Sequence, residues 1–175
     1  MEKKVLPETG GKFINGNWHV KNLNFLSEFM EKCGYSTGDI ARAVGLQRQA
    51  VTRWLVVDDT KLSYVIKFSE AIGCDFLISY EVPEVSQERT NMAIDKALFN
   101  KTIQGFMDSR LAFLRLALWK TNTTYTALAD KLGLSRSSVQ NWLMKDDISF
   151  RYIYLIAEAM DWTVDIYFRA KEKAE

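Results

Sequence analysis

The sequence predicts a mainly α-helical protein made of two similar units in tandem, with a small antiparallel β-ribbon formed by the strand that ends each unit. Three observations predict this fold class. The phrase "GLQRQAVTRW" at 45–54 returns as "GLSRSSVQNW" at 133–142. Segments on both sides of each phrase have apolar residues at helical spacing, and each half closes in a run of alternating apolar residues.

The internal repeat extends well beyond this phrase. Trp142 lies 88 residues after Trp54, and a shift of the chain by 88 aligns it with itself from roughly residue 24 to 80 without a gap. Chance does not keep one register over that length, so the chain contains a duplicated unit, and two copies make a tandem pair rather than a solenoid. We divide the chain into an N-terminal arm (1–20), a first unit (21–82), a partly helical linker (83–107) and a second unit (108–175).

Each unit is expected to contain four helices. Apolar spacing predicts helices at 23–33, 37–44 and 63–72 in the first unit, and at 110–120, 125–132 and 151–160 in the second. A further helix follows each repeated glycine and directs Val51, Trp54 and Leu55, or Val139, Trp142 and Leu143, toward the core.

The ends of these helices have recognisable signals. Ser36 and Thr124 are suited to N-cap the second helix of each unit, because a side-chain oxygen there accepts from amides of the first turn. The glycines of the repeated phrase suit the left-handed residue that ends that helix. Ser135 is a good N-cap for the helix that follows, whereas Gln47 at the matching position is a poor one.

The last element of each unit is expected to be a strand. Apolar residues alternate at 76–82 and again at 164–170. A strand by itself has an unpaired edge, which is a liability. Because duplication supplies a partner related by an approximate twofold axis, we expect the two strands to pair antiparallel within one chain.

The central motif resembles a known family. The stretches "DIARAVGLQRQAVTRW" and "ALADKLGLSRSSVQNW" resemble the helix-turn-helix of the Cro and lambda-repressor-like (XRE) family, with Ala41 and Ala129 where two helices cross closely. The resemblance implies two lambda-repressor-like helix-turn-helix domains in tandem. Some antitoxin members of this family also end in a strand that pairs across a homodimer.

The resemblance also implies which residues contact DNA. In such a motif the second helix lies in the major groove and its first residues face base edges. Arginine can fork onto guanine, and glutamine or asparagine onto adenine. The contact positions carried over by register are Arg48, Gln49, Ala50 and Arg53 in the first unit and Arg136, Ser137, Ser138 and Asn141 in the second, with Thr37 and Tyr125 facing the phosphate backbone.

Two Asp-Asp pairs, at 58–59 and 146–147, follow these helices. Adjacent aspartates in a loop serve turns and helix starts, and no further ligand type recurs beside them, so we expect turn residues rather than a metal site. The pairs weaken the case for DNA binding, because they would repel phosphate and only Lys61 and Lys145 compensate nearby.

Several function classes are disfavoured by the sequence. It contains no glycine-rich phosphate loop, no nucleophile with a base, no metal cluster and a single histidine, His19, so we expect no enzyme, cofactor or metal. It has neither a signal peptide nor an apolar run of about eighteen residues, and we expect a cytoplasmic protein without a membrane partner. Cys33 and Cys74 are expected to be reduced, packed thiols.

Two functions therefore remain open. The first is sequence-specific binding of double-stranded DNA by a transcriptional regulator, a monomer that acts as an intramolecular pseudo-dimer. The second is a protein-interaction or antitoxin-like module that keeps the helix-turn-helix shell without strong DNA binding. The polar faces of the two reading helices favour the first, whereas the formal net charge of +1 and the acid pairs favour the second.

Overall fold

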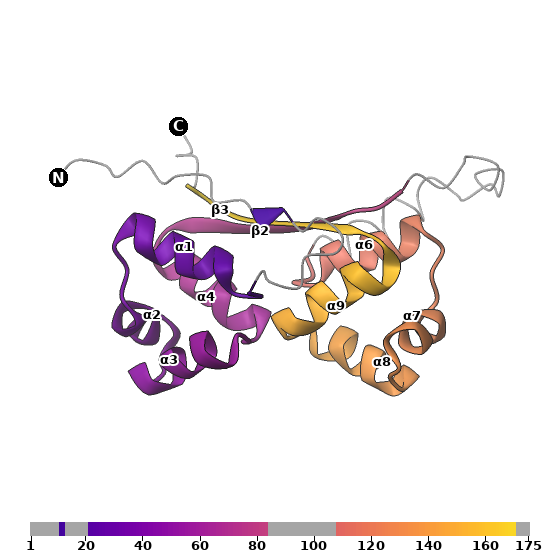
Figure 1. Cartoon of the computed structure of the whole chain (residues 1–175), viewed down its shortest axis with the longest axis horizontal. Coiled ribbons are helices and arrows are strands. Elements are labelled where there is room, and N and C mark those ends of the chain that lie inside the picture. Colours follow the sequence, from indigo (N-terminus) through magenta and orange to yellow (C-terminus); the bar gives the residue numbers. More distant parts are fainter. Residues whose placement is uncertain (1–10, 13–20, 84–107, 171–175) are drawn as a thin grey trace.

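A computed structural model of the chain describes residues 11–12, 21–83 and 108–170. The protein is mainly helical with a small antiparallel sheet (Figure 1). The first unit comprises α1 (Asn24–Cys33), α2 (Thr37–Val44), α3 (Arg48–Val57), α4 (Leu62–Ala71) and β2 (Cys74–Glu81). The second comprises α6 (Ala112–Lys120), α7 (Tyr125–Leu132), α8 (Arg136–Lys145), α9 (Phe150–Met160) and β3 (Thr163–Ala170). Apart from Gly11–Lys12, the predicted arm, the linker and His19 lie outside the described residues.

The predicted helix ends are confirmed. Ser36 forms a capping box with Asp39, in which the Ser36 hydroxyl accepts from the Asp39 N–H at 3.2 Å and the Asp39 carboxylate accepts from the Ser36 N–H at 2.8 Å. These hydrogen bonds from Ser36 hold the pKa of Asp39 below its ordinary value. Thr124 and Ser135 cap α7 and α8 in the same sense, whereas the Gln47 side chain makes no cap.

The predicted ribbon is also confirmed, and its register reveals the symmetry of the molecule. Strands β2 and β3 pair antiparallel along their whole length, with Ile78 opposite Ile166. These residues are 88 apart, so equivalent positions of the two units face each other, as a twofold axis through the ribbon requires. A second such pair, the bridge between Lys61 and Ser149, lies in the loops before α4 and α9. The two units are therefore related by a pseudo-twofold axis.

A short third strand was not part of the sequence prediction. Strand β1 (Gly11–Lys12) pairs antiparallel with β3, with Gly11 opposite Ile166, so the strand order is β1-β3-β2. Part of the N-terminal arm is thus bound to the sheet.

Each long strand packs on helices of the other unit. The Phe168 ring of β3 lies 4.1 Å from the Phe29 ring of α1. On the other side, Tyr80 of β2 packs on Phe113 of α6 and donates a hydrogen bond from its hydroxyl to the carbonyl of Ile153 at 2.7 Å. Figure 1 shows the ribbon lying across both helical lobes. The two units consequently share one continuous hydrophobic core.

The loops at the axis join the units a second time. The Leu62 N–H donates to the Ile148 carbonyl at 2.8 Å, and the equivalent Phe150 N–H donates to the Thr60 carbonyl at 3.0 Å. These amides open α4 and α9 and would otherwise lack a partner within their helices. Each unit therefore completes a helix of the other.

The tryptophans of the repeated phrase are less buried than expected. The sequence predicts Trp54 and Trp142 as core residues, but both are half-buried at the margin of the core. Trp54 stacks on Tyr64 at 5.1 Å and Trp142 on Tyr152 at 4.7 Å. An indole is large and carries a polar N–H, so a position with one face on the core and one edge toward solvent suits it.

Candidate nucleic-acid interface

The predicted reading helices, α3 and α8, lie on either side of the pseudo-twofold axis at the edge of the molecule opposite the sheet (Figure 1). Each follows its preceding helix through a tight turn in which Gly45 (φ 75°) or Gly133 (φ 64°) is left-handed. Such a φ favours glycine because it has no Cβ. Buried residues fix each helix in place: Val51 and Val139 are fully buried, and Ala41 and Ala129 lie almost fully buried in the helices before them. Both helices are thereby fixed with one face outward.

In the first unit, the predicted contact residues lie on that outward face. Arg48, Gln49 and Arg53 are exposed, and Ala50 is half-buried. The Arg48 Nε donates to the Thr37 Oγ1 of α2 at 3.2 Å. The structure thus brings together two residues that the resemblance assigned separately, to bases and to backbone.

In the second unit, Arg136, Ser137 and Asn141 are exposed and Ser138 is half-buried. The hydroxyls of Ser137 and Ser138 lie 2.8 and 2.9 Å from the Ser135 hydroxyl, so both take part in the cap that opens α8.

The second unit has no counterpart of the Thr37–Arg48 hydrogen bond. Tyr125, which occupies the position equivalent to Thr37, is exposed. Among the described residues, neither Tyr125 nor Arg136 has a hydrogen-bond partner through its side chain. The two predicted sites therefore differ in how firmly the shared arginine is held.

Four further residues complete the outward faces and were missed by the sequence analysis. Thr52 and Gln140 lie between the predicted contact positions, and Val56 and Met144 end the two faces. Val56 is 78% exposed and Met144 is 83% exposed, which is unusual for apolar side chains on equivalent positions. Their signal was available, because they lie three and seven residues after Gln49 and Ser137, the spacing of one helix face.

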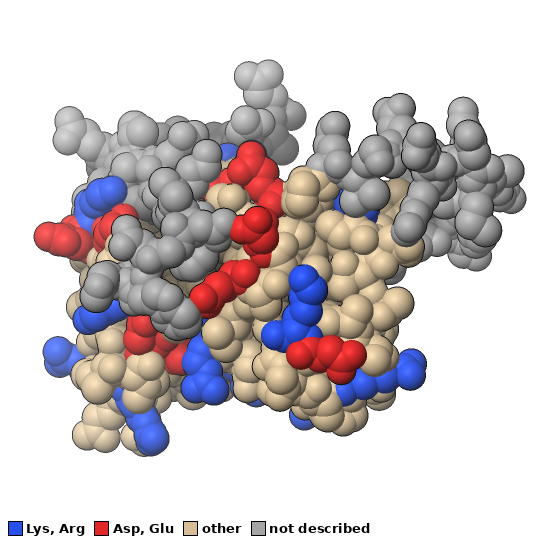
Figure 2. All heavy atoms as spheres, turned by 45° about the vertical axis from the view of Figure 1, so that its right-hand side comes forward, with Lys and Arg blue, Asp and Glu red and all other residues tan. Residues whose placement is uncertain are grey.

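The electrostatics of α3 and α8 are uniformly basic. The two helices carry Arg48, Arg53, Arg136 and Lys145 and no acidic residue. Figure 2 is turned about the vertical axis of Figure 1, so its lower margin is the edge where these helices lie. That margin shows Lys and Arg, whereas the main band of Asp and Glu lies higher, toward the sheet. A near-neutral protein thus has a local basic edge.

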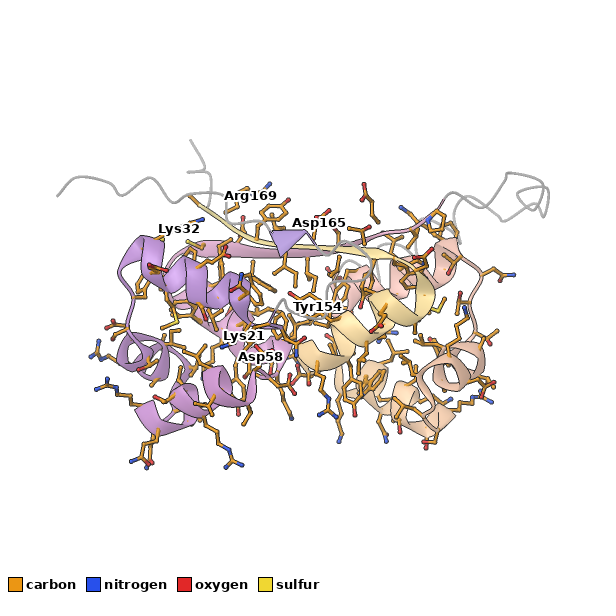
Figure 3. All side chains as sticks on the ribbon, in the orientation of Figure 1. Lys21, Lys32, Asp58, Tyr154, Asp165 and Arg169 are labelled. Carbon is orange, nitrogen blue, oxygen red and sulfur yellow. The ribbon has the colours of Figure 1, made fainter. Side chains whose placement is uncertain are left out.

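The first aspartate of each pair supports the start of a helix within its own unit. Asp58 and Asp146 are left-handed residues that end α3 and α8. The Asp58 carboxylate accepts from the N–H groups of Asn22 and Leu23, at 2.7 and 3.0 Å, before α1. Asp58 also faces Tyr154 of α9 (Figure 3). Burial, and to a lesser extent this carboxylate, raises the pKa of Tyr154.

Asp146 makes the equivalent contacts before α6. Its carboxylate accepts from the N–H groups of Arg110 and Leu111 and from the Ser109 hydroxyl. Partial burial opposes the ionisation of Asp146, but these hydrogen bonds outweigh it and hold its pKa below the ordinary value.

The second aspartate of each pair reaches across the axis. Asp59 accepts from the Ser149 hydroxyl at 2.7 Å and from the Arg151 N–H at 3.1 Å, at the start of α9. Asp147 accepts from the N–H and hydroxyl of Ser63, at 3.0 and 2.8 Å, at the start of α4. The expectation of turn residues was therefore incomplete, because these carboxylates cap helices of the opposite unit. Their charge lies against positive helix ends, which offsets part of the repulsion toward phosphate that the sequence analysis expected.

Other kinds of site were sought in the described part of the chain. It contains no cluster of three His, Cys, Asp or Glu residues that could hold a metal ion. None of its helices combines the length and apolar character needed to cross a bilayer. Both cysteines are buried thiols. Comparison of the chain with models of known protein families, with curated proteins and with solved structures finds no match.

Proposed function

We propose that this protein binds double-stranded DNA in a sequence-specific way and regulates transcription, with α3 and α8 entering successive major grooves. Each unit acts as a lambda-repressor-like helix-turn-helix domain, and the two together form an intramolecular pseudo-dimer. The chain binds as a monomer. The observation that carries the proposal is the pair of equivalent helices with exposed Arg, Gln and Asn side chains on one edge of the molecule.

The chemistry of that edge supports base reading. Gln49, Arg53, Arg136 and Asn141 have no side-chain partner among the described residues, so their donors and acceptors are available to a ligand. Arginine matches the acceptors of guanine, and an amide matches adenine. The absence of acidic residues from α3 and α8 favours approach to a polyanion.

The direct test is DNA binding by the purified chain at several salt concentrations. Fluorescence anisotropy with labelled duplexes from a random pool should give an affinity that falls steeply as salt rises. The slope of log K against log salt is about −0.9 for each phosphate contact. A flat dependence, or no binding at 50 mM salt, would contradict the proposal.

Single substitutions then locate the interface. Arg48→Ala and Arg136→Ala should each weaken binding to the preferred duplex by about 1–3 kcal/mol. Arg169→Ala is the matched control, because it removes the same charge from the sheet, at the opposite edge (Figure 3). Equal binding by all three variants would exclude α3 and α8 as reading helices.

A second candidate function is a protein-interaction module of the antitoxin type. The exposed apolar side chains of Val56, Val57 and Met144 favour it, since such side chains often mark a protein contact. The salt titration separates the two, because an apolar protein contact depends weakly on salt.

A further inference from the structure

The supports that hold α3 and α8 are the same in both units. The amides that open α4 and α9 donate to equivalent carbonyls across the axis, and Asp59 and Asp147 cap equivalent positions. Ile78 pairs with its own equivalent, Ile166, in the ribbon. Two outward helices are therefore presented by one symmetric frame, with their separation fixed by buried contacts on both sides of the axis.

The outward faces that this frame presents are not the same. Arg48 of α3 is matched by Arg136 of α8, but every other polar position of the face differs. The unequal pairs are Gln49 with Ser137, Thr52 with Gln140, and Arg53 with Asn141. Residues four apart lie above one another on a helix, so Gln49 and Arg53 form one row, and Ser137 and Asn141 form the matching row.

These rows differ in the bases that they fit. The face of α3 carries two guanidinium groups, and Thr37 holds one of them, Arg48, in position. The face of α8 carries one guanidinium together with the amides of Gln140 and Asn141. A guanidinium fits the two acceptors of guanine, whereas an amide fits the donor and acceptor of adenine.

We propose that one chain reads a single, non-palindromic duplex whose halves differ in composition: the half under α3 is richer in guanine and the half under α8 is richer in adenine. One guanine, under Arg48 and Arg136, recurs in both halves. This inference rests on the proposed function and adds the class of DNA that the protein takes. A homodimer with identical reading helices is limited to palindromes, whereas the fused chain is not.

The fixed frame adds a constraint on spacing. The half-site centres are separated by one value, about 34 Å or one turn of the duplex, because the ribbon and the crossed caps leave no flexible joint between the units. Insertion of five base pairs between the halves turns one half to the far side of the duplex, and should reduce affinity at least tenfold.

The test is a selection of sites from random duplexes by the full chain, followed by measurement of how many chains bind each selected duplex. The expected result is one chain on a site with two unlike halves. A palindromic site, or two chains on each duplex, would overturn the inference and leave DNA binding intact. Failure to enrich any duplex would overturn the proposed function as well.

A face exchange makes the test specific to the named residues. The triple variant Gln49→Ser, Thr52→Gln, Arg53→Asn gives α3 the polar face of α8, and all three positions are exposed, so the fold is not expected to change. Its preferred site should become close to a palindrome built from the former α8 half, with at least a tenfold preference over the parent site. The reciprocal variant Ser137→Gln, Gln140→Thr, Asn141→Arg should select a palindrome of the α3 half. Retention of the parent site by both variants would overturn the inference, provided their thermal melting matches that of the parent chain.

Discussion

The two units of this chain agree where they touch each other and differ where they face outward. The residues at the axis form matched pairs of contacts, as in the crossed caps made by Asp59 and Asp147. The exposed faces of α3 and α8 share only their arginine among polar positions. This difference teaches that the interface limits what can change, because a substitution there disturbs the closure of both units, whereas an exposed side chain has no partner in the protein to satisfy.

A second difference lies in the core. The first unit is packed with rings, among them Phe25, Phe29, Phe68 and Phe76, and the second unit supplies two more, Phe150 and Phe168. In the second unit, positions equivalent to Phe29 and Phe68 are Ala117 and Ile156. Tyr80 takes part in filling that side, and its buried hydroxyl needs the Ile153 carbonyl. The same backbone plan is thus filled by two different sets of side chains.

The largest expected effect comes from breaking this exchange of rings. Phe168→Ala should reduce the free energy of unfolding by about 3–5 kcal/mol, because it leaves a cavity in the core of the opposite unit. Thermal or urea unfolding should still show a single transition, since the core is continuous. Tyr167→Ala, on the other face of β3, is the matched control and should cost less. Separate melting of the two units in the Phe168 variant would contradict the shared core.

A smaller effect is expected at the crossed caps, which test how equal the two units are. Asp59→Ala and Asp147→Ala should each lower the free energy of unfolding by about 0.5–2 kcal/mol, the usual range for loss of an N-cap. Urea titration of the two variants should give similar values, because the lost hydrogen bonds are equivalent. Glu70→Ala, at an exposed position, serves as control. A large inequality between the two variants would show that the axis contacts are not energetically matched.

The pH dependence of stability sharpens the same comparison at Asp146. Its pKa is lowered in the folded chain, so the carboxylate stabilises the fold above its ordinary pKa near 4, and this stabilisation is lost as pH falls through the folded value. Asp146→Asn should therefore lose less stability than the parent between pH 6 and pH 3. Chemical unfolding at a series of pH values measures this, and parallel curves for the two proteins would contradict it.

The smallest effect is expected at Thr37, where the two reading faces differ in rigidity. Thr37→Val removes the acceptor that holds Arg48, and should weaken binding to the preferred duplex by about 0.5 kcal/mol, the low end for a hydrogen bond, because this one is exposed. Thr126→Val, at an exposed position of α7, should leave the affinity unchanged. Equal affinities for the parent and the Thr37 variant would show that the hydrogen bond does not position Arg48.

Much of the fold could be predicted because its signals are local or repeated. The caps at Ser36, Thr124 and Ser135 follow from residue type and spacing, and the pairing of the two strands follows from the gapless repeat. What could not be predicted is which unit a buried face packs against. Periodicity shows that Phe168 points inward, but the same pattern fits packing on its own helices or on α1.

The candidate site shows the same limit. The exposed positions of α3 and α8 follow from register, and the structure presents them outward as expected. The crossed caps were missed because Asp59 and Asp147 contact residues 84 to 92 positions away. No local pattern distinguishes an aspartate in a turn from one that caps a distant helix. Val56 and Met144 were missed because apolar residues on a helix are expected to be buried.

The exchange of strands also has a consequence during synthesis on the ribosome. The helices of the first unit are complete by residue 71, yet the ring that covers Phe29 belongs to Phe168. At roughly 5–20 residues per second, nearly a hundred further residues take on the order of 10 seconds to appear. Throughout that interval the nascent chain carries an uncovered apolar surface on α1, a binding site for chaperones that disappears only when β3 emerges and pairs with β2.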